Sequence, residues 1–297
     1  MNPLRVTPEF LYKHPLPRHE QEGDKQSRGR VLVIAGSVET PGAALLAGLG
    51  ALRAGAGILQ IATCRSTAPH LAMAMPEAMV VGCPETPAGG IDPASAPRLT
   101  ELGSGCDAVL IGPGMMDTAA VAELTSALLQ SLDARALVLD ASAFATLRMA
   151  EIPSKHAGRI VVTPHSGEMA KFLDIAREEV DSDPLRAALQ AAAALRAVVA
   201  MKGASTLVVS PDGEAWLCDN GSIGLATSGS GDTLAGILAG LLARGTEPTV
   251  ATVWAVYIHG EAGRRLAKRN GSLGLLAREI PGQIPSILQE IGDASIK

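Results

Sequence analysis

The sequence is poor in aromatic residues, with three Phe, two Trp and two Tyr among 297 residues. Alanine and glycine are abundant instead, and such small side chains suit close packing of helices against a sheet. Cysteine is scarce too, and its spacing matches neither a CxxC pair nor a Cys/His zinc site. We therefore expect reduced thiols, mostly in or near the core. The cysteines are Cys64, Cys83, Cys106 and Cys218.

The chain has no excess of positive charge and no basic cluster. Its 25 Lys and Arg against 30 Asp and Glu give a net charge of −5, which argues against a nucleic-acid surface. Any bound phosphate must then be held by a local site. The N-terminus lacks a basic-then-apolar signal pattern, and no apolar run is long enough to cross a bilayer. We expect a soluble cytoplasmic protein without a membrane segment.

Several catalytic motifs are also missing. There is no G-x-x-x-x-G-K-[ST], which excludes a P-loop NTPase, and no G-x-G-x-x-G after the first strand, which leaves a Rossmann cofactor site unsupported. Neither G-x-S-x-G nor H-E-x-x-H occurs. The chemistry of this protein must therefore come from another arrangement of residues.

What the chain does contain is a regular alternation of short apolar runs and helical patterns. This order predicts an α/β fold with a largely parallel sheet and helices on both faces, ending in an antiparallel hairpin over 206–218. We find no repeat, linker or composition break, and expect one domain over residues 1–297, with 1–28 wrapping over the surface. The expected strands are 30–35, 58–62, 78–82, 108–112, 136–140, 159–162 and 197–202, and the expected helices 41–53, 118–132, 144–150, 184–195, 250–268 and 273–289.

The segment 224–244 (GLATSGSGDTLAGILAGLLAR) combines a glycine-rich turn with the start of an apolar helix. Backbone N–H groups and the helix dipole make such a turn an anion site, and Gly229 and Gly231 let a phosphate approach closely. A carboxylate at Asp232 suits a general base for an attacking hydroxyl. Helix capping is the alternative role for Asp232, and this segment alone favours neither.

Polar residues follow most of the expected strands. In an open parallel sheet a ligand binds beyond the carboxyl ends of the strands, so these residues are candidates for a site. Turns use Gly, Pro and Asp in any protein, and this alone explains each segment taken singly. It explains less readily why a Lys, a His and an Asp should all lie at one edge of the sheet. The segments are Gly36-Ser37, Gly112-Pro113-Gly114, Asp140, Thr163-Pro164-His165, Lys202-Gly203 and 229–232.

With these motifs in their observed order, the chain resembles the ADP-dependent NAD(P)H-hydrate dehydratases, repair enzymes of the ribokinase-like superfamily. GSGD occurs throughout that superfamily, whereas TPHSGE is more specific, because related sugar and vitamin kinases generally have Asn in place of His165. The match covers nearly the whole chain. Its segments are RVLVIAGSVETPGAALLAGLGALRAGAG, PEAMV, IGPG, VLDA, VTPHSGE, KGAST, GLATSGSGDTLAGILAGLL, HGEAG and GSLGLLAREIP.

The resemblance implies that the substrate is the (S)-hydrate of NADH or NADPH. A phosphoryl group from ADP, or from ATP, turns the ring hydroxyl into a leaving group, and elimination restores the dihydropyridine. It also implies Mg²⁺, with Asp232 as the base and the amides of 229–231 stabilising the phosphoryl group. Metal ligands stay unassigned; Glu168 is a candidate through water, or only a residue that stabilises a helix start.

The family's binding positions carry over residue by residue. The hydrate positions are Ala43, Gly114, His165 and Asp232. The nucleotide positions are Lys202, Gly203, Ala204, Ser205, Thr206, Gly229, Ser230 and Gly231. Two of these assignments have simpler alternatives, since His165 could be a turn or cap residue and Lys202 a solvated strand end.

The chain departs from the family pattern at four positions. It has Ser142 where LDAD is common and Thr40 where Tyr is common, which leaves substrate detail open, and Ser166 and Ser230 are milder changes. We expect no N-terminal epimerase domain, so that a separate protein would correct the other epimer. The resemblance also implies a homo-oligomer, a tetramer.

Two other functions compete with this interpretation. The first is an ATP-dependent kinase of the same superfamily, acting on a vitamin precursor or sugar, against which His165 argues. The second is a nucleotide-binding regulator without catalysis, against which the intact 229–232 motif argues.

Overall fold

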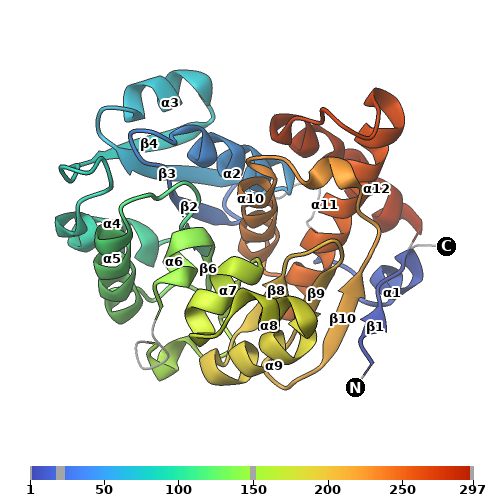
Figure 1. Ribbon diagram of the computed structural model, residues 1–297. Coiled ribbons are helices and arrows are strands. Elements are labelled where there is room, and N and C mark those ends of the chain that lie inside the picture. The colour runs from blue at the N-terminus through green and yellow to red at the C-terminus, as the bar shows by residue number, and fades with distance from the viewer. Residues whose placement is uncertain (1, 18–23, 148–151, 295–297) are drawn as a thin grey trace.

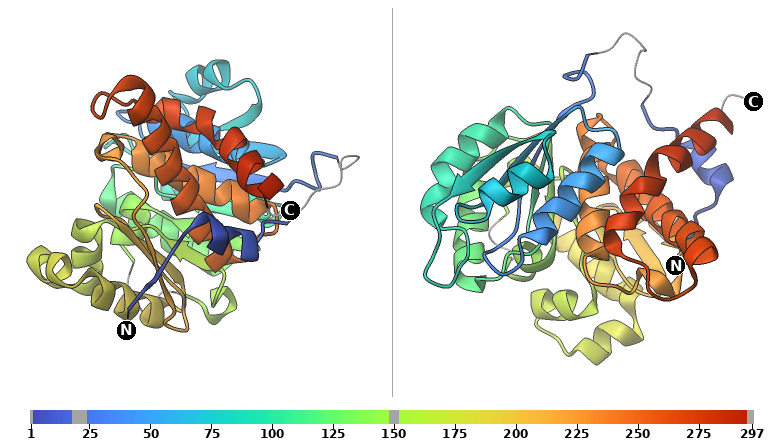
Figure 2. Two further views of the ribbon diagram at one scale, coloured as in Figure 1. Left: turned by 90° about the vertical axis from the view of Figure 1, so that its right-hand side faces the viewer. Right: turned by 90° about the horizontal axis from the view of Figure 1, so that it is seen from above.

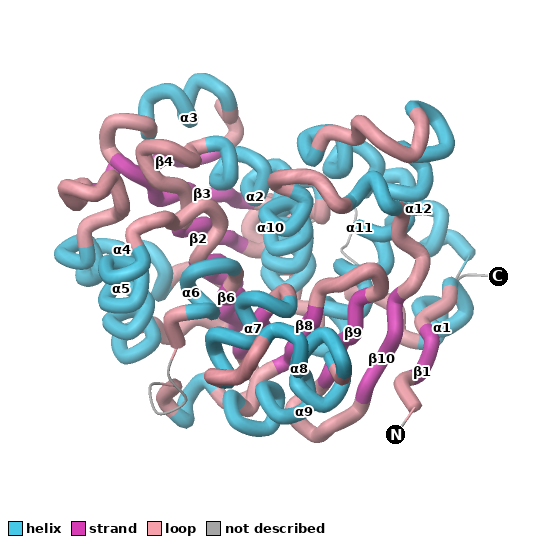
Figure 3. Tube along the Cα trace, in the orientation of Figure 1, coloured by secondary structure: helices cyan, strands magenta, loops and turns pink. Residues whose placement is uncertain are grey.

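The computed structural model describes residues 2–17, 24–147 and 152–294, and it is built around one ten-stranded sheet (Figure 1). The strand order is β1-β10-β9-β8-β7-β6-β5-β2-β3-β4, with β1 and β4 at the two edges (Figure 3). Among the described strands only β9 runs against its neighbours, which confirms the predicted mostly parallel sheet and the hairpin. The strands are β1 (Leu4–Arg5), β2 (Arg30–Ile34), β3 (Ile58–Cys64), β4 (Ala78–Cys83), β5 (Ala108–Ile111), β6 (Ala136–Leu139), β7 (Ile160–Val162), β8 (Val198–Met201), β9 (Thr206–Val209) and β10 (Ala215–Cys218).

Helices cover both faces of the sheet, as the two views of Figure 2 show. One core packs α2, α10, α11 and α12 against the sheet, and the other packs α4, α5, α7 and α9. The helices are α1 (Pro8–Lys13), α2 (Gly42–Arg53), α3 (Ala68–Ala74), α4 (Ala96–Ser104), α5 (Thr118–Ser131), α6 (Ala141–Ala145), α7 (Ser166–Leu173), α8 (Arg177–Ser182), α9 (Pro184–Leu195), α10 (Ser230–Ala243), α11 (Pro248–Asn270) and α12 (Ile284–Ala294), with short 3-10 helices η1 (Pro93–Ser95), η3 (Ser154–His156), η4 (Ile223–Leu225) and η5 (Ala277–Gln283).

The continuous apolar runs arise because the central strands are buried on both faces. In β2, Val31 and Val33 belong to one core, while Leu32 and Ile34 belong to the other. Successive side chains of a strand point to opposite faces, so a strand covered on both sides needs apolar residues at every position. All four cysteines are buried free thiols, as the sequence predicts.

Helices α2 and α10 lie unusually close together because glycines line their contact. A Cβ on Gly236 would lie 2.0 Å from the carbonyl oxygen of Ala47, and one on Gly240 would lie 2.4 Å from that of Ala51. Backbone therefore rests on backbone at this contact. It fixes α10, whose first turn carries the glycine-rich motif, against α2 and the sheet.

We expect Gly236→Ala to lower the free energy of unfolding by about 3 kcal/mol or more, because the new methyl group meets rigid backbone. Gly42→Ala is the matched control, since a Cβ there has nothing within 4 Å. Urea denaturation of both variants measures the difference. Equal stabilities would show that the two helices can separate without cost.

The N-terminal segment is more than a surface wrap. Strand β1 pairs with β10, and Leu11 of α1 is fully buried. The indole of Trp254 donates to the carbonyl of His14 at 2.7 Å. The predicted surface position therefore holds for most of residues 2–17, of which only Val6 and Leu11 are buried, but an edge strand and a short helix were not predicted there because each needs only a few apolar residues.

Most predicted helices agree with the structure to within two residues at each end, but two differ by more. The short helix expected over 144–150 begins at Ala141 and ends at Ala145, and residues 148–150 lie outside the described ones. The helix expected over 273–289 is instead η5 followed by α12, with 273–276 in irregular conformation. Pro281 lies inside η5 and lacks the N–H that an α-helix interior needs.

Candidate active site

The glycine-rich motif forms the first turn of α10. Gly229 is the N-cap residue, with a φ of 85° that suits glycine, and no side chain caps this helix. The alternative role of Asp232 as a cap is thus not what the structure shows. The N–H groups of Gly231 and Asp232 have no hydrogen-bond partner among the described residues, so they are available to an anion.

Asp232 is a largely buried carboxylate beside this anion site. Burial raises its pKa to about 6, the nearby charge of Asp140 adds to the rise, and Lys202 opposes it. A carboxylate whose pKa is near neutrality is poised to accept a proton. Among the described residues none hydrogen-bonds to this carboxylate.

Lys202 connects the ends of three neighbouring strands. Its Nζ lies 2.9 Å from Oδ1 of Asp140, which follows β6, and the same oxygen accepts from Thr163 Oγ1, which follows β7, at 2.6 Å. Asp140 is only 2% exposed. Burial opposes the charge on Lys202, but Asp140 and Glu168 outweigh it and raise the pKa of the ammonium. Lys202 is therefore a partly buried, paired cation, with 18% of its side chain exposed, and not a solvated strand end.

The ammonium of Lys202 also faces the glycine-rich turn. It lies 3.5 Å from the position that a Cβ on Gly231 would occupy. Glu168 Oε2 lies 3.9 Å from the same ammonium. A lysine ammonium has three N–H donors, so one bond to Asp140 leaves two for an incoming phosphate.

His165 and Glu168 form a capping box at the start of α7. His165 Nδ1 accepts from the N–H groups of Gly167 and Glu168, and Glu168 Oε2 accepts from the N–H of His165 at 2.9 Å. The simpler structural roles of both residues are therefore present. His165 Nε2 and the second Glu168 oxygen, Oε1, lie 3.3 Å apart and pair with each other, so a ligand would compete with this contact.

Ala43, in the first turn of α2, and Gly114 form a separate contact. A Cβ on Gly114 would lie 2.5 Å from Cβ of Ala43, and Gly114 has a φ of 64°. Thr40 Oγ1 donates to the Gly114 carbonyl at 2.6 Å and lies 2.7 Å from Ser37 Oγ. The hydroxyl of Thr40, which stands where the family commonly has Tyr, thus connects the loop after β2 to the loop after β5.

A cavity of about 870 Å³ brings most of the predicted nucleotide residues together. His165, at the hydrate position, also lines it. Ser205, Gly229, Asp232 and the Ala43–Gly114 pair are outside its lining. Of the predicted residues, those lining it are His165, Lys202, Gly203, Ala204, Thr206, Ser230 and Gly231.

Sequence reasoning missed the far wall of this cavity. Asn220 follows β10, and His259 and Gly260 lie on α11 with Val256 one turn earlier. Ile223 and Leu225 of η4 add apolar surface. The HGEAG segment was a usable signal, because it places a histidine within an apolar helix.

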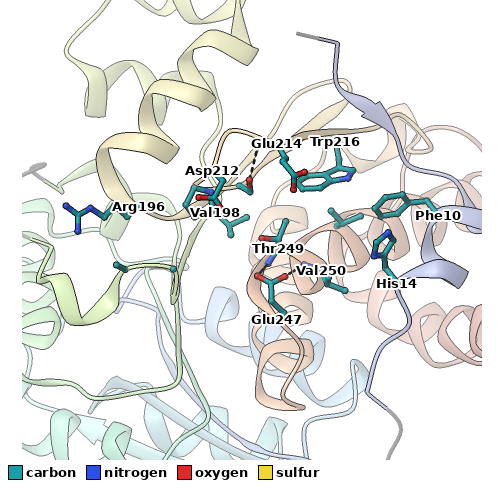
Figure 4. Close-up of a pocket in the computed structure, with 15 residues that line it drawn as sticks. Phe10, His14, Arg196, Val198, Asp212, Glu214, Trp216, Glu247, Thr249 and Val250 are labelled. Atoms are coloured by element: carbon teal, nitrogen blue, oxygen red, sulfur yellow. Dashed lines mark hydrogen bonds between the residues drawn. The ribbon is translucent and has the colours of Figure 1, made fainter.

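A second cavity of about 670 Å³ lies at the opposite, amino-terminal end of β8 and β10 (Figure 4). Figure 4 shows Trp216, Phe10 and His14 on one side and Glu247, which accepts from the N–H groups of Thr249 and Val250, on another. No predicted site residue lines it. The cavity at the carboxyl edge is therefore the candidate active site.

Within the described residues, no group of three or more His, Cys, Asp or Glu side chains could hold a metal ion, and no helix has the length and hydropathy needed to cross a membrane. Mg²⁺ commonly binds through one or two carboxylates together with substrate phosphates and water. Glu168 and Asp232 fit such a shared site better than an all-protein cage.

This fold and cavity define an α/β enzyme that acts with a phosphate-bearing nucleotide. A family model described as NAD(P)H-hydrate dehydratase matches residues 31–286. The chain is 46% identical to the ADP-dependent (S)-NAD(P)H-hydrate dehydratase of Xanthomonas campestris pv. campestris, over 96% of each chain. The chain belongs to the NAD(P)H-hydrate dehydratase family.

Solved structures agree with this assignment. The ADP/ATP-dependent NAD(P)H-hydrate dehydratase of Bacillus subtilis, co-crystallized with ATP/Mg²⁺, is 32% identical with a TM-score of 0.86, over 98% of this chain and 99% of that one. A ribokinase-like superfamily protein of Enterococcus faecalis is 26% identical with a TM-score of 0.83, over 97% and 96%. The predicted ribokinase-like fold is confirmed. The chain also spans 52% of a bifunctional NAD(P)H-hydrate repair enzyme of Moorella thermoacetica, with 37% identity over 93% of this chain.

Proposed function

We propose that this protein is an ADP-dependent (S)-NAD(P)H-hydrate dehydratase, which returns hydrated NADH or NADPH to the reduced dinucleotide. The observation that carries the proposal is the position of Asp232. A mostly buried carboxylate with a pKa near 6 lies in the first turn of α10, beside free backbone N–H groups and the Lys202 ammonium. This is the arrangement needed to transfer a phosphoryl group to a hydroxyl.

In this mechanism Asp232 accepts the proton of the ring hydroxyl. The oxygen of that hydroxyl attacks the terminal phosphoryl group of the nucleotide. A new O–P bond forms and the bond to the leaving nucleotide phosphate breaks. The N–H groups of the turn and Lys202 stabilise the charge on the phosphoryl group. Phosphate then leaves with the electron pair of the C–O bond, the neighbouring ring carbon gives its proton to the departing phosphate or to water, and the C–H electron pair restores the double bond.

The remaining predicted residues divide between the two ligands. Lys202, Gly203, Ala204, Ser205, Thr206 and 229–231 are proposed to hold the nucleotide, and Ala43, Gly114 and His165 the hydrate. Support for this division comes from α10, whose first turn meets Lys202 on one side and Leu46 of α2 on the other. Mg²⁺ carried by the phosphates, near Glu168 and Asp232, would neutralise their charge.

The test follows the return of dihydronicotinamide absorbance from hydrated NADH with Mg²⁺, with ADP and ATP in separate reactions. Recovery with ADP is expected. Recovery with neither nucleotide, together with ATP turnover on a hydroxymethyl vitamin precursor, would assign the protein to the kinases. Absence of all turnover despite nucleotide binding would favour the regulator. The same assay with hydrated NADPH settles the preferred dinucleotide.

The activity should depend on pH through Asp232. Because burial and Asp140 hold its pKa at about 6, the base is protonated below that pH. We expect kcat/KM to rise about tenfold per pH unit below pH 6 and to level off above it. A profile from pH 5 to 8 at saturating Mg²⁺ measures this, and an acid limb centred near pH 4 would contradict it.

We further propose a homotetramer in a reducing, cytoplasmic location, acting with a separate epimerase. The exposed side chains of Met73 on α3 and Met79 on edge strand β4 support self-association, and the free thiols support a reducing compartment. Light scattering that shows a monomer at assay concentration would remove the tetramer.

A further inference from the structure

The cavity contains two hydrogen-bond acceptors that the proposed mechanism leaves unused. One is on His259 of α11, and the other is on Asn220 in the loop after β10. Both residues line the same cavity as Lys202 and Gly231. Their orientation can be assigned because each makes a second contact with a backbone carbonyl.

The tautomer of His259 follows from its contact with Ser230. Its Nε2 lies 3.1 Å from the Ser230 carbonyl oxygen and 3.1 Å from Ser230 Oγ. A carbonyl oxygen cannot donate, so Nε2 carries the hydrogen. Burial lowers the pKa of His259 to about 4, so the ring is neutral and Nδ1 is a bare acceptor. None of the described residues donates to Nδ1.

The amide of Asn220 is oriented in the same way. Its Nδ2 donates to the Tyr257 carbonyl at 2.9 Å, which leaves Oδ1 as the acceptor. Oδ1 lies 2.8 Å from the position that a Cβ on Gly260 would occupy, so it sits beside the residue that follows His259. A side chain on residue 260 would displace this amide.

The walls around these acceptors are apolar, formed by Ile223, Leu225 and Val256. Two acceptors would repel phosphate oxygens, whereas Lys202 and the turn of α10 attract them. The nucleoside end of the nucleotide therefore belongs on this side of the cavity.

We propose that His259 Nδ1 and Asn220 Oδ1 together read the exocyclic amine of adenine, whose two N–H donors match two acceptors. The inference rests on the proposed function, because it assigns this cavity to the nucleotide. A 6-oxo purine places a third acceptor against the other two. A site built to accept hydrogen bonds discriminates strongly against a ligand that lacks the donors. His259 also holds Ser230 in the anion-binding turn, so it links base recognition to phosphate binding.

The experiment measures ADP, inosine 5′-diphosphate and 2′-deoxy-ADP binding to the full chain by calorimetry with Mg²⁺. We expect ADP to bind at least about 30-fold more tightly than inosine diphosphate. 2′-Deoxy-ADP should bind within about threefold of ADP, since the acceptors meet the base and not the ribose.

Two substitutions of His259 form a matched pair. His259→Gln places an amide nitrogen near the position of Nε2, keeps the donor to Ser230 and lacks the Nδ1 acceptor. We expect its ADP preference to fall to about fivefold or less. His259→Asn places an amide oxygen near Nδ1 and loses the Ser230 contact. It should keep the preference while binding both nucleotides about threefold to tenfold more weakly.

Gly260→Ala provides an independent check, because the new methyl group displaces the amide of Asn220. It should also reduce the preference for ADP over inosine diphosphate. Equal wild-type affinities for the two diphosphates, an unchanged preference in folded His259→Gln, or a loss confined to 2′-deoxy-ADP would each overturn the inference. Binding is measured without the hydrate. Adenine selectivity without hydrate turnover would therefore sustain this inference while the proposed reaction fails.

Discussion

Asp232→Asn is expected to reduce kcat for hydrate dehydration by about 10³-fold or more while leaving ADP affinity within a few-fold of wild type. Asparagine keeps the size of the side chain but cannot accept the hydroxyl proton, and positioned general bases contribute about 10² to 10⁴ in rate. The N–H groups of the turn remain in place to bind phosphate. Single-turnover absorbance assays and calorimetry separate the two effects.

The same substitution should stabilise the folded protein. Burial raises the pKa of Asp232 from 3.8 to about 6, so the folded state binds the proton more tightly than the unfolded state does. Stability therefore falls as pH rises from about 4 to about 6, by at most about 3 kcal/mol and by less after solvent screening. Replacing the carboxyl of Asp232 by an amide, which does not titrate, removes this loss of stability.

We expect Asp232→Asn to be about 1 to 2 kcal/mol more stable than wild type at pH 7 and equal to it near pH 4. Asp212→Asn, on the exposed turn between β9 and β10, is the control and should change neither rate nor stability. A variant that keeps most of its activity would show that another group accepts the proton.

Lys202→Met is expected to have the second large effect, because it breaks two functions at once. ADP affinity should fall about 100-fold, since a charge-assisted contact with phosphate is lost. The free energy of unfolding should fall by about 3 to 5 kcal/mol, because Asp140 is 2% exposed and would keep a buried charge without its partner.

A double variant separates the two consequences. Adding Asp140→Asn to Lys202→Met removes the uncompensated charge, so most of the stability should return while ADP affinity stays low. Urea denaturation and calorimetry on the single and double variants measure this. If the single variant is as stable as wild type, the charge of Asp140 does not depend on Lys202 for its stabilisation.

The strands were predictable because a strand buried on both faces leaves a distinctive run of apolar residues. All seven expected parallel strands are present, and β8 differs from its expected bounds by one residue at each end. The expected helix over 184–195 agrees in both bounds. The N-terminal strand and helix were missed because they pair at the sheet edge through only a few residues, such as Leu11.

The site was only partly predictable for a related reason. Glycine-rich and charged motifs such as GSGD and KGAST are local in sequence, so they could be assigned in advance. The ends of β6, β7 and β8 meet because parallel strands share one edge, and that order placed Lys202 and Asp140 within reach. Asn220 carried no such local signal, and HGEAG marked His259 without its orientation, because the orientation of both side chains depends on carbonyls 37 and 29 residues away in the chain.

The sequence by itself determined the fold class, the strand segments and the family, because these depend on local periodicity and on motifs that survive as strings of residues. Tertiary structure alone decided the electrostatics of the site. The pKa of Asp232, the pairing of Lys202 and the tautomer of His259 depend on burial and on charges from distant segments, which no local pattern encodes. The same distinction holds for Gly236, whose role becomes visible only when α2 lies against it.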